Sequence, residues 1–421
     1  MTSQIEDLLR AEAPQVLGAL VRRFGRFDIA EDAVQEALLV AAGRWEAEGV
    51  PDDPRSWLIR VGYRRMVDLL RSDRARRRRE LETGAAELAM AEPARAVQGD
   101  GIDDSLTLLL LCCHPALGHT SQVALTLRAV GGLTTAEIAH AYGTSEATMG
   151  TRISRAKQQL AKAGARFTLP TDTDRDSRTT AVLRVLYLIF NEGYTATTGV
   201  DLTRVDLTAE AIRLTRMLHA TLPGDAEVTG LLALMLLTES RRAARTDAGG
   251  LIPLAEQDPS RWNREMIDEG TTLIDSVWNR APAGPYQLHA AIAAVHAAAG
   301  PGHTDWPQIA MLYLWLERLT PTPPVQLARV VAVAHAHGPA RGLALLDDLN
   351  RRHHLDRDPL TRQREHAVRA HLLQQTGDQA TAAELFRRAA DLTGNQVEQR
   401  YLHRKADQLD RPQPPTARRT R

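Results

Sequence analysis

The chain has 421 residues, enough for two to four domains, and its 52 basic and 52 acidic residues give a net charge of zero. This balance excludes a general attraction to nucleic acid, so any such binding must come from local basic patches. Hydrophobic residues make up 43% of the chain and aromatic residues only 4%. Because alanine and leucine dominate and alternating β-branched residues are scarce, we expect an all-α globular protein.

The cysteines, the apolar runs and the N-terminus indicate a cytoplasmic protein. Cys112 and Cys113 are adjacent, which argues against a disulfide framework and is typical of a reducing compartment. His114 follows them, but no second ligand pair stands at a zinc-site spacing, so we expect neither a metal nor another cofactor. The apolar run at 228–237 is about half the length of a membrane span, and residues 1–12 lack the features of a signal peptide. We therefore expect no contact with a membrane.

Two helices are predicted at the N-terminus, over residues 5–26 and 28–45. Asp28 and Glu31 are expected to form a capping box at the start of the second helix. The core stripe of this helix consists of Val34, Leu38, Ala41 and Trp45. Its exposed side carries an acidic, amide-rich shoulder of Glu31, Asp32, Gln35 and Glu36. This shoulder is either an ordinary solvated face or a docking surface.

A third, strongly basic helix is predicted over residues 55–80. Its apolar side consists of Trp57, Leu58, Val61, Met66 or Val67, and Leu70. Its other side carries Arg60, Arg64, Arg65, Arg71 and Arg74, and the helix continues into Arg76–Arg79. Aromatic anchors beside clustered arginines suit a helix that holds a nucleic-acid backbone while bases are stacked or splayed out.

Residues 81–104 lose the periodic pattern and are predicted to form an acidic linker. Apolar and helical patterns resume at 106–111 and around 120–130. They lead into residues 133–160, where two short helical patterns lie on either side of Gly143. This stretch predicts a helix-turn-helix.

Local signals define both of these short helices. Thr134 and Glu137 are predicted to cap the first helix, Gly143 to end it in a left-handed conformation, and Ser145 to cap the second. The second helix would bury Met149, Ile153, Ala156 and Leu160 and turn Thr148, Arg152, Arg155 and Gln159 outwards. A helix-turn-helix presents side chains to the major groove in this way, and the alternative is a helical hairpin with a solvated basic face.

After a polar linker at 166–179 the chain is predicted to be helical again over 180–410. The clearest unit spans 363–392, where Gly377 is followed by a small-large-small pattern. That pattern consists of Ala382, Phe386 and Ala389. It is typical of tetratricopeptide-like helix pairs.

A fainter copy of this unit has its turn at Gly338, so we expect a solenoid of stacked helix pairs with a concave surface. Residues 411–421 are predicted to be a disordered basic tail.

Three of these stretches, in this order, resemble the bacterial RNA polymerase sigma factors of the extracytoplasmic-function type. Asp32-Ala33-Val34-Gln35-Glu36 is similar to the family helix that docks on the clamp coiled coil of the polymerase β′ subunit. Trp57-Leu58 through Val67-Asp68 is similar to the helix that opens and reads the minus-ten element. Residues 145–156 are similar to the helix that enters the major groove at the minus-thirty-five element. The resemblance covers residues 1–165, and members with a large helical C-terminal extension form a recognised branch of the family.

The resemblance implies a sigma region 2 domain at 1–80, a region 4 helix-turn-helix domain at 105–165 and a tetratricopeptide-like domain at 180–410. The residues expected to bind core polymerase are Glu31, Asp32, Gln35 and Glu36. Those expected at the minus-ten element are Trp57, Arg60, Arg64, Arg65 and Arg71. Those expected at the minus-thirty-five element are Ser145, Thr148, Thr151, Arg152 and Arg155. Two positions depart from the family pattern, because Arg64 stands where many members carry Asn and Gly150 where Lys is common.

The leading hypothesis is therefore a sigma factor without catalysis of its own, which binds core RNA polymerase, through its β′ clamp and β subunits, and promoter DNA. The alternative is a one-component helix-turn-helix regulator whose helical domain senses a ligand or partner. Such a regulator would need neither the acidic shoulder nor the basic third helix. The C-terminal domain would either inhibit the DNA-binding domains through an intramolecular contact or be required for activity through a protein partner.

An enzyme is the third hypothesis, because the chain has 14 histidines. We find no metal-spaced His-Glu cluster, no phosphate-binding glycine loop and no nucleophile elbow. The histidines that stand closest together are expected to be solvated: His335, His337, His353 and His354.

Overall fold

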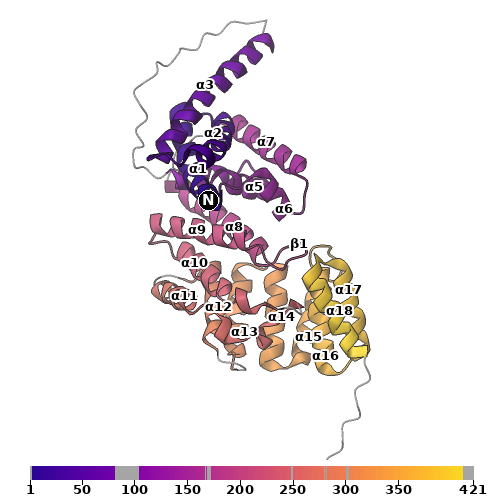
Figure 1. Cartoon of the computed structure of the whole chain (residues 1–421). Helices are drawn as coiled ribbons and strands as arrows, with labels where there is room; N and C mark the ends of the chain where they lie inside the picture. The colour runs from indigo at the N-terminus through magenta and orange to yellow at the C-terminus, as the bar shows by residue number, and fades with distance from the viewer. Residues whose placement is uncertain are drawn as a thin grey trace, which may run out of the picture. The chain divides into compact units, whose positions relative to one another are not determined.

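The structure is a computed structural model, and the part of the chain that it describes is almost entirely α-helical (Figure 1). It describes residues 2–80, 104–165, 167, 172–247, 250–278, 280, 282–299 and 303–410. The all-α prediction is confirmed. Predictions for 81–103 and for the tail at 411–421 lie outside the described residues. The chain divides into two compact units, unit 1 at residues 1–188 and unit 2 at 189–421.

Unit 1 begins with three packed helices, α1 (Thr2–Phe24), α2 (Phe27–Glu48) and α3 (Pro54–Glu80). Gly25 has a φ of 66°, a left-handed conformation that turns the chain between α1 and α2. The predicted apolar sides meet in the core, where Leu58 and Met66 of α3 are fully buried. Trp45 of α2 and Trp57 of α3 make an edge-on ring contact with centroids 5.4 Å apart.

The predicted start of the second helix is wrong by one residue, and its capping box does not form. α2 begins at Phe27 with Arg26 as N-cap, and no side chain makes a cap hydrogen bond there. Asp28 lies within the first turn and accepts hydrogen bonds from Arg26 at 3.0 and 2.8 Å. Phe27 is buried and belongs to the first turn of α2, which is why the helix begins one residue earlier than predicted. Glu31 lies on the buried side of the helix and does not cap it.

The rest of the predicted core stripe of α2 is largely confirmed. Val34, Ala41 and Trp45 are buried, whereas Leu38 is only half-buried and Ala37 takes the inner position.

The second part of unit 1 contains α4 (Ser105–Cys112), α5 (His119–Ala129), α6 (Thr135–Ala141) and α7 (Glu146–Lys162). The predicted capping box is confirmed, since Thr134 accepts from the Glu137 amide at 3.1 Å and Glu137 accepts from the Thr134 amide at 2.7 Å. Gly143 has a φ of 58°, and the Thr144 amide donates to the Ala139 carbonyl at 3.0 Å. This is the Schellman ending of a helix.

The second helix of the motif is also as predicted. Ser145 caps α7 by accepting a hydrogen bond from the Thr148 amide at 3.2 Å. The four predicted core residues of α7 are buried: Met149, Ile153, Ala156 and Leu160. These short-range bonds fix where each helix begins and ends, so the angle between α6 and α7 follows from local sequence.

α8 (Asp172–Tyr194) runs through the division between the units and begins inside the predicted linker at 166–179. Unit 2 continues with α9 (Val205–Thr221), α10 (Ala226–Glu239), α11 (Arg264–Val277), α12 (Pro285–Ala298), α13 (Trp306–Leu319), α14 (Pro323–His337), α15 (Pro339–His353), α16 (Arg362–Thr376), α17 (Gln379–Leu392) and α18 (Gln396–Asp410). Short 3-10 turns at Arg242–Ala244, Leu254–Glu256 and Pro259–Arg261 lie between α10 and α11.

Both predicted helix pairs of unit 2 are confirmed. Gly377 is left-handed between α16 and α17, and Gly338 has a φ of 91° between α14 and α15. The small-large-small residues of α17 are fully buried against α16 and α18: Ala382, Phe386 and Ala389. The four histidines expected to be solvated are exposed, although His335 also stacks on Trp306 with ring centroids 4.0 Å apart.

The repeats of unit 2 do not form a freely ended solenoid, in which each repeat contacts only its neighbours. Strand β1 (Thr198–Gly199), which precedes the repeats, pairs in parallel with β4 (Gly394–Asn395) just before the last helix. The buried Asn395 amide donates to the Ala196 and Asp201 carbonyls, both at 2.9 Å. A second contact joins α18 to the hairpin of β2 (Thr246–Asp247) and β3 (Gly250–Leu251), where Arg404 donates to a carbonyl. The beginning and end of unit 2 are thus tied together.

Candidate polymerase and promoter interfaces

In unit 1, the face of α7 that is predicted to read DNA is largely exposed to solvent. Ser145, Thr148, Thr151 and Arg155 are exposed, and Arg152 is half-exposed. The hydroxyls are held by local bonds, since Thr151 donates to the Ala147 carbonyl at 2.9 Å. Within the described residues neither arginine makes a hydrogen bond or an ion pair. The two arginines can therefore reach an external acceptor without breaking a contact of the fold.

The basic face of α3 is exposed at four positions: Arg60, Arg64, Arg65 and Arg71. Arg65 donates to Glu36 of α2 at 2.9 Å, whereas the other three point to solvent without an ion pair in the described part of the chain. Trp57 is half-buried against Trp45, so it anchors α3 to α2 and presents only part of its ring to a ligand. The side chains from Arg74 onwards on α3 lie outside the described residues.

The acidic shoulder of α2 differs from the prediction at one residue. Glu31 was expected on the exposed side, but only 2% of it is exposed. Asp32 is exposed, and Gln35 and Glu36 are half-buried. Glu31 is turned inwards because its charge has two partners in the second part of unit 1.

Sequence reasoning missed two residues that extend this shoulder. Leu39 is 73% exposed and Val40 is 44% exposed, although both are large apolar residues. Leu39 lies seven positions after Asp32 and three after Glu36, so it shares their side of the helix. The signal was present in the sequence, because the run Leu38-Leu39-Val40 is too wide for one buried stripe. We call the exposed surface of Asp32, Gln35, Glu36, Leu39 and Val40 the α2 face.

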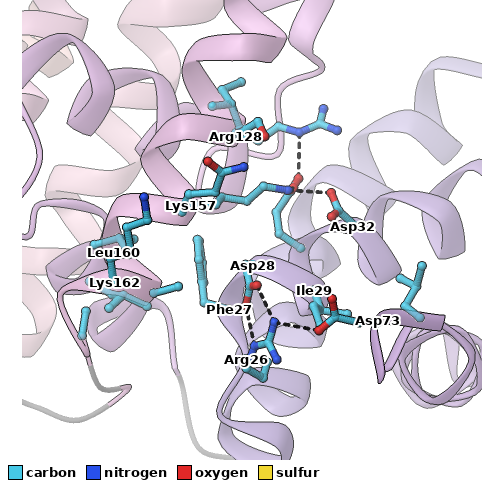
Figure 2. Close-up of a pocket in the computed structure, with 18 of the residues that line it drawn as sticks. Arg26, Phe27, Asp28, Ile29, Asp32, Asp73, Arg128, Lys157, Leu160 and Lys162 are labelled. Carbon is cyan, nitrogen blue, oxygen red and sulfur yellow. Dashed lines mark hydrogen bonds and ion pairs between the residues drawn. The ribbon is translucent and has the colours of Figure 1, made fainter. Parts of the chain in front are cut away.

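Glu31 belongs to a compact group of charges that we call the Lys157 cluster, made of Glu31, Asp32, Arg128 and Lys157. Lys157 of α7 donates to Glu31 at 2.9 Å and to Asp32 at 2.6 Å, and Arg128 of α5 donates to Glu31 at 2.9 Å (Figure 2). Lys157 is itself only 8% exposed. These bonds join α2 to the helix-turn-helix.

Within the cluster, Glu31 and Lys157 stabilise each other's charged form. Burial would raise the pKa of the Glu31 carboxyl, but the charges of Lys157 and Arg128 outweigh it and lower that pKa. Burial would likewise lower the pKa of the Lys157 ammonium, but Glu31 and Asp32 raise it. Glu31 and Lys157 therefore keep each other ionised, whereas burial and the neighbouring Glu31 charge raise the pKa of the Asp32 carboxyl.

A cavity of about 1050 Å³ lies beside the Lys157 cluster, between α2, α3 and α7 (Figure 2). Phe27, Ile29 and Leu160 line it together with charged groups. Arg26 pairs with Asp28 and lies 3.5 Å from Asp73 across the same space. Two further ion pairs join the two parts of unit 1, Arg10 with Glu137 and Arg22 with Asp104. The contact beside the cavity is thus largely polar, while α1 also packs on α4 and α5.

Comparison with known proteins agrees with this arrangement. The model for Sigma-70 region 2 matches residues 8–77, and the model for Sigma-70 region 4 matches residues 107–160. The chain is 31% identical to a probable ECF RNA polymerase sigma factor SigI of Mycobacterium tuberculosis, over 36% of this chain and 52% of that one. It is 30% identical to the ECF RNA polymerase sigma factor SigG of the same species, over 47% of this chain and 57% of that one. The chain belongs to the extracytoplasmic-function sigma factors.

This sigma factor carries a C-terminal extension that the region 2 and region 4 models do not cover. Residues 178–278 match a family of unknown function, DUF6596. An uncharacterized protein of Rhizobium meliloti is 42% identical over 97% of this chain and 96% of its own length, so it matches the extension as well. No solved structure matches the chain. The region 2 match argues against the one-component regulator, which would need only the helix-turn-helix.

No three His, Cys, Asp or Glu side chains of the described residues gather as a metal site would require. No described helix of this sigma factor is both long and apolar enough to cross a membrane.

Proposed function

We propose that this sigma factor binds core RNA polymerase through the α2 face, opens the minus-ten element with α3 and reads the minus-thirty-five element with α7. The observation that carries the proposal is the region 2 match, because a regulator that only binds duplex DNA needs no such domain. The exposed Leu39 and Val40 support it, since burial of an exposed apolar residue at an interface is favourable. The arginines of α3 and α7 supply positive charge for DNA.

We further propose that unit 2 is required for activity and acts through a protein contact. More than half of the chain lies beyond the region 4 match, and a relative of nearly the same length is similar along its whole length. Stacked helix pairs present extended surfaces that suit proteins and peptides better than small molecules.

Replacing Leu39 by Asn should weaken the binding of core polymerase about 5- to 30-fold, the loss of a roughly 1–2 kcal/mol anchor. Leu39 is 73% exposed, so its replacement should leave folding unchanged. Asp32 is a poorer choice for this test because it also pairs with Lys157. Binding is measured by titrating labelled core polymerase with the purified variants.

The control is Val50→Asn, at another exposed apolar residue (45% exposed) that lies in the loop after α2 and outside the α2 face. Equal affinities of wild type, Leu39→Asn and Val50→Asn would remove the α2 face from the docking surface.

Replacing Arg155 by Ala should cost about 1–3 kcal/mol of promoter affinity if the guanidinium reads a base. If it contacts a phosphate instead, the slope of log affinity against log salt should fall by about one. The measurement is binding of holoenzyme to a promoter fragment at several salt concentrations. Ser154→Ala is the control, because this exposed residue lies on the cavity side of the same helix. A variant Arg155→Ala with both affinity and salt slope unaltered would contradict the assignment.

A further inference from the structure

Helix α13 has an apolar side that the fold of unit 2 does not use. Leu312 and Leu316 of this helix are buried in the core that α13 shares with α12 and α14. On the solvent side, Met311 is 49% exposed, Trp315 45% and Leu319 54%. Their spacing of four places them in one line along the helix, which we call the α13 stripe. No other helix in the described part of the chain exposes three large apolar residues.

The composition of α13 is unusual for a helix with a free surface. Residues 306–316 contain no charged residue, and the two charges that follow are Glu317 and Arg318. Glu317 pairs with Arg329 of α14, so it belongs to the contact between these helices. A surface helix normally carries polar residues on the side that faces water, and a helix that is apolar all round is normally buried. Contiguous exposed apolar residues are typical of interaction sites. The α13 stripe therefore has the character of an interface.

The charges around the stripe favour a second copy of this chain as the partner. A two-fold symmetric contact places the same surface against itself, so a charged residue near the axis would meet its own like charge. The α13 stripe contains no charge, and Arg318, the one exposed charge of α13, stands beyond Trp315 toward the end of the helix. The chain as a whole has a net charge of zero, so two copies do not repel each other over longer distances.

The geometry of the stripe also fits a copy of itself. Residues four apart form a ridge, and ridges of this kind interdigitate in the commonest class of helix packing in globular proteins. With the two-fold axis beside Trp315, Met311 of one copy faces Leu319 of the other, and the two indole rings meet at the centre. Tryptophan is among the residue types most enriched at the energetic centre of interfaces.

We propose that this sigma factor forms a homodimer in which the α13 stripes of two copies pack against each other in antiparallel orientation. α13 has 14 residues and is about 21 Å long, so the contact is smaller than a standard protein interface. The dimer is therefore weak and depends on concentration, with a dissociation constant on the order of 10 µM. The homodimer goes beyond the proposed function and does not rest on it, since none of its residues belongs to α2, α3 or α7.

Sedimentation velocity of the full-length protein over a concentration series measures this dimer directly. Wild type should change from monomer to dimer around the expected dissociation constant. Trp315→Glu should weaken the dimer more than about tenfold, because two carboxylates would be buried close to the axis. If Trp315→Glu does not fold by circular dichroism, Leu319→Glu takes its place, since Leu319 is the most exposed residue of the stripe. A folded variant that dimerises as wild type does would overturn the interface.

Two control variants should dimerise as wild type does. Leu360→Glu introduces the same charge at a leucine that is 92% exposed in the loop before α16. Leu39→Asn removes the exposed leucine of the α2 face, and so tests whether that apolar surface mediates self-association instead. Dimerisation that is lost in Leu39→Asn and kept in Trp315→Glu would contradict the assignment to α13.

An exchange of charges tests the antiparallel register. Met311→Arg and Leu319→Glu should each weaken self-association, because each homodimer would bury two unpaired charges. An equimolar mixture of the two variants should form a dimer again, since the new guanidinium of one copy then faces the new carboxylate of the other. A mixture that stays monomeric would overturn this register. Wild-type protein that stays monomeric at about ten times the expected dissociation constant would overturn the homodimer and leave the stripe to a different protein.

Discussion

Ending the chain after Leu188 should leave a protein that binds core polymerase but does not start transcription at its promoter. The reason is the proposed requirement for unit 2, which such a protein lacks. Leu188 is the last residue of unit 1, and the cut keeps the part of α8 in which Arg184 lies 3.0 Å from His119. A cut within residues 166–179, the predicted linker, would remove this part of α8. Run-off transcription and core binding are measured side by side.

A substitution in the full chain provides a companion to this cut. Phe386 is fully buried where α16, α17 and α18 meet, so Phe386→Ala should destabilise unit 2 by about 3–5 kcal/mol without altering unit 1. Like the cut, Phe386→Ala should lower transcription. Constitutive transcription by the shortened protein would instead identify unit 2 as an inhibitor. Wild-type transcription by both the shortened protein and Phe386→Ala would contradict the proposed role of unit 2.

Lowering the pH from about 6.5 to 4 should destabilise unit 2 by roughly 3 kcal/mol for each of three buried histidines. Burial lowers the pKa of His289, His296 and His371 from 6.5 to about 4. Nearby cations add to the effect, Arg241 and His335 at His296, and Lys405 and His335 at His371. The unfolded chain then binds more protons than the folded one between these two pH values. The stabilising contribution is complete above pH 6.5 and is lost as the pH falls.

Urea unfolding followed by tryptophan fluorescence measures this effect, because Trp306 contacts His296 with ring centroids 5.3 Å apart. His371→Gln should reduce the acid sensitivity, while His353→Gln should not, since His353 is exposed. Unit 1 should lose stability only at lower pH. The pKa of Glu31 is lowered from 4.5, so the ionised Glu31 carboxyl stabilises unit 1 above pH 4.5, and this stabilisation is lost as the pH falls below that value. An unfolding free energy of unit 2 that is unchanged between pH 6.5 and 4 would contradict buried neutral histidines.

The sequence by itself determined the features that depend on neighbours along the chain. The capping box of Thr134 and Glu137, the left-handed Gly143 and the Ser145 cap each involve residues within a few positions of one another. Hydrogen bonds of this range do not depend on the rest of the fold, so the caps of the helix-turn-helix were predicted at the correct residues. The helix pair around Gly377 was predictable for the same reason.

Only the tertiary structure decided which charged residues are buried and which elements close the domains. Glu31 and Lys157 stand 126 positions apart, and each reads as a solvated residue by periodicity alone. Asn395, which ties the end of unit 2 to its beginning, pairs with a carbonyl 199 positions away. Burial of a polar group is favourable only when a partner satisfies it, and a helical period carries no information about a partner from a distant segment. The contact between α2 and α7 is therefore invisible in the sequence, because its cause lies in how separate helices pack.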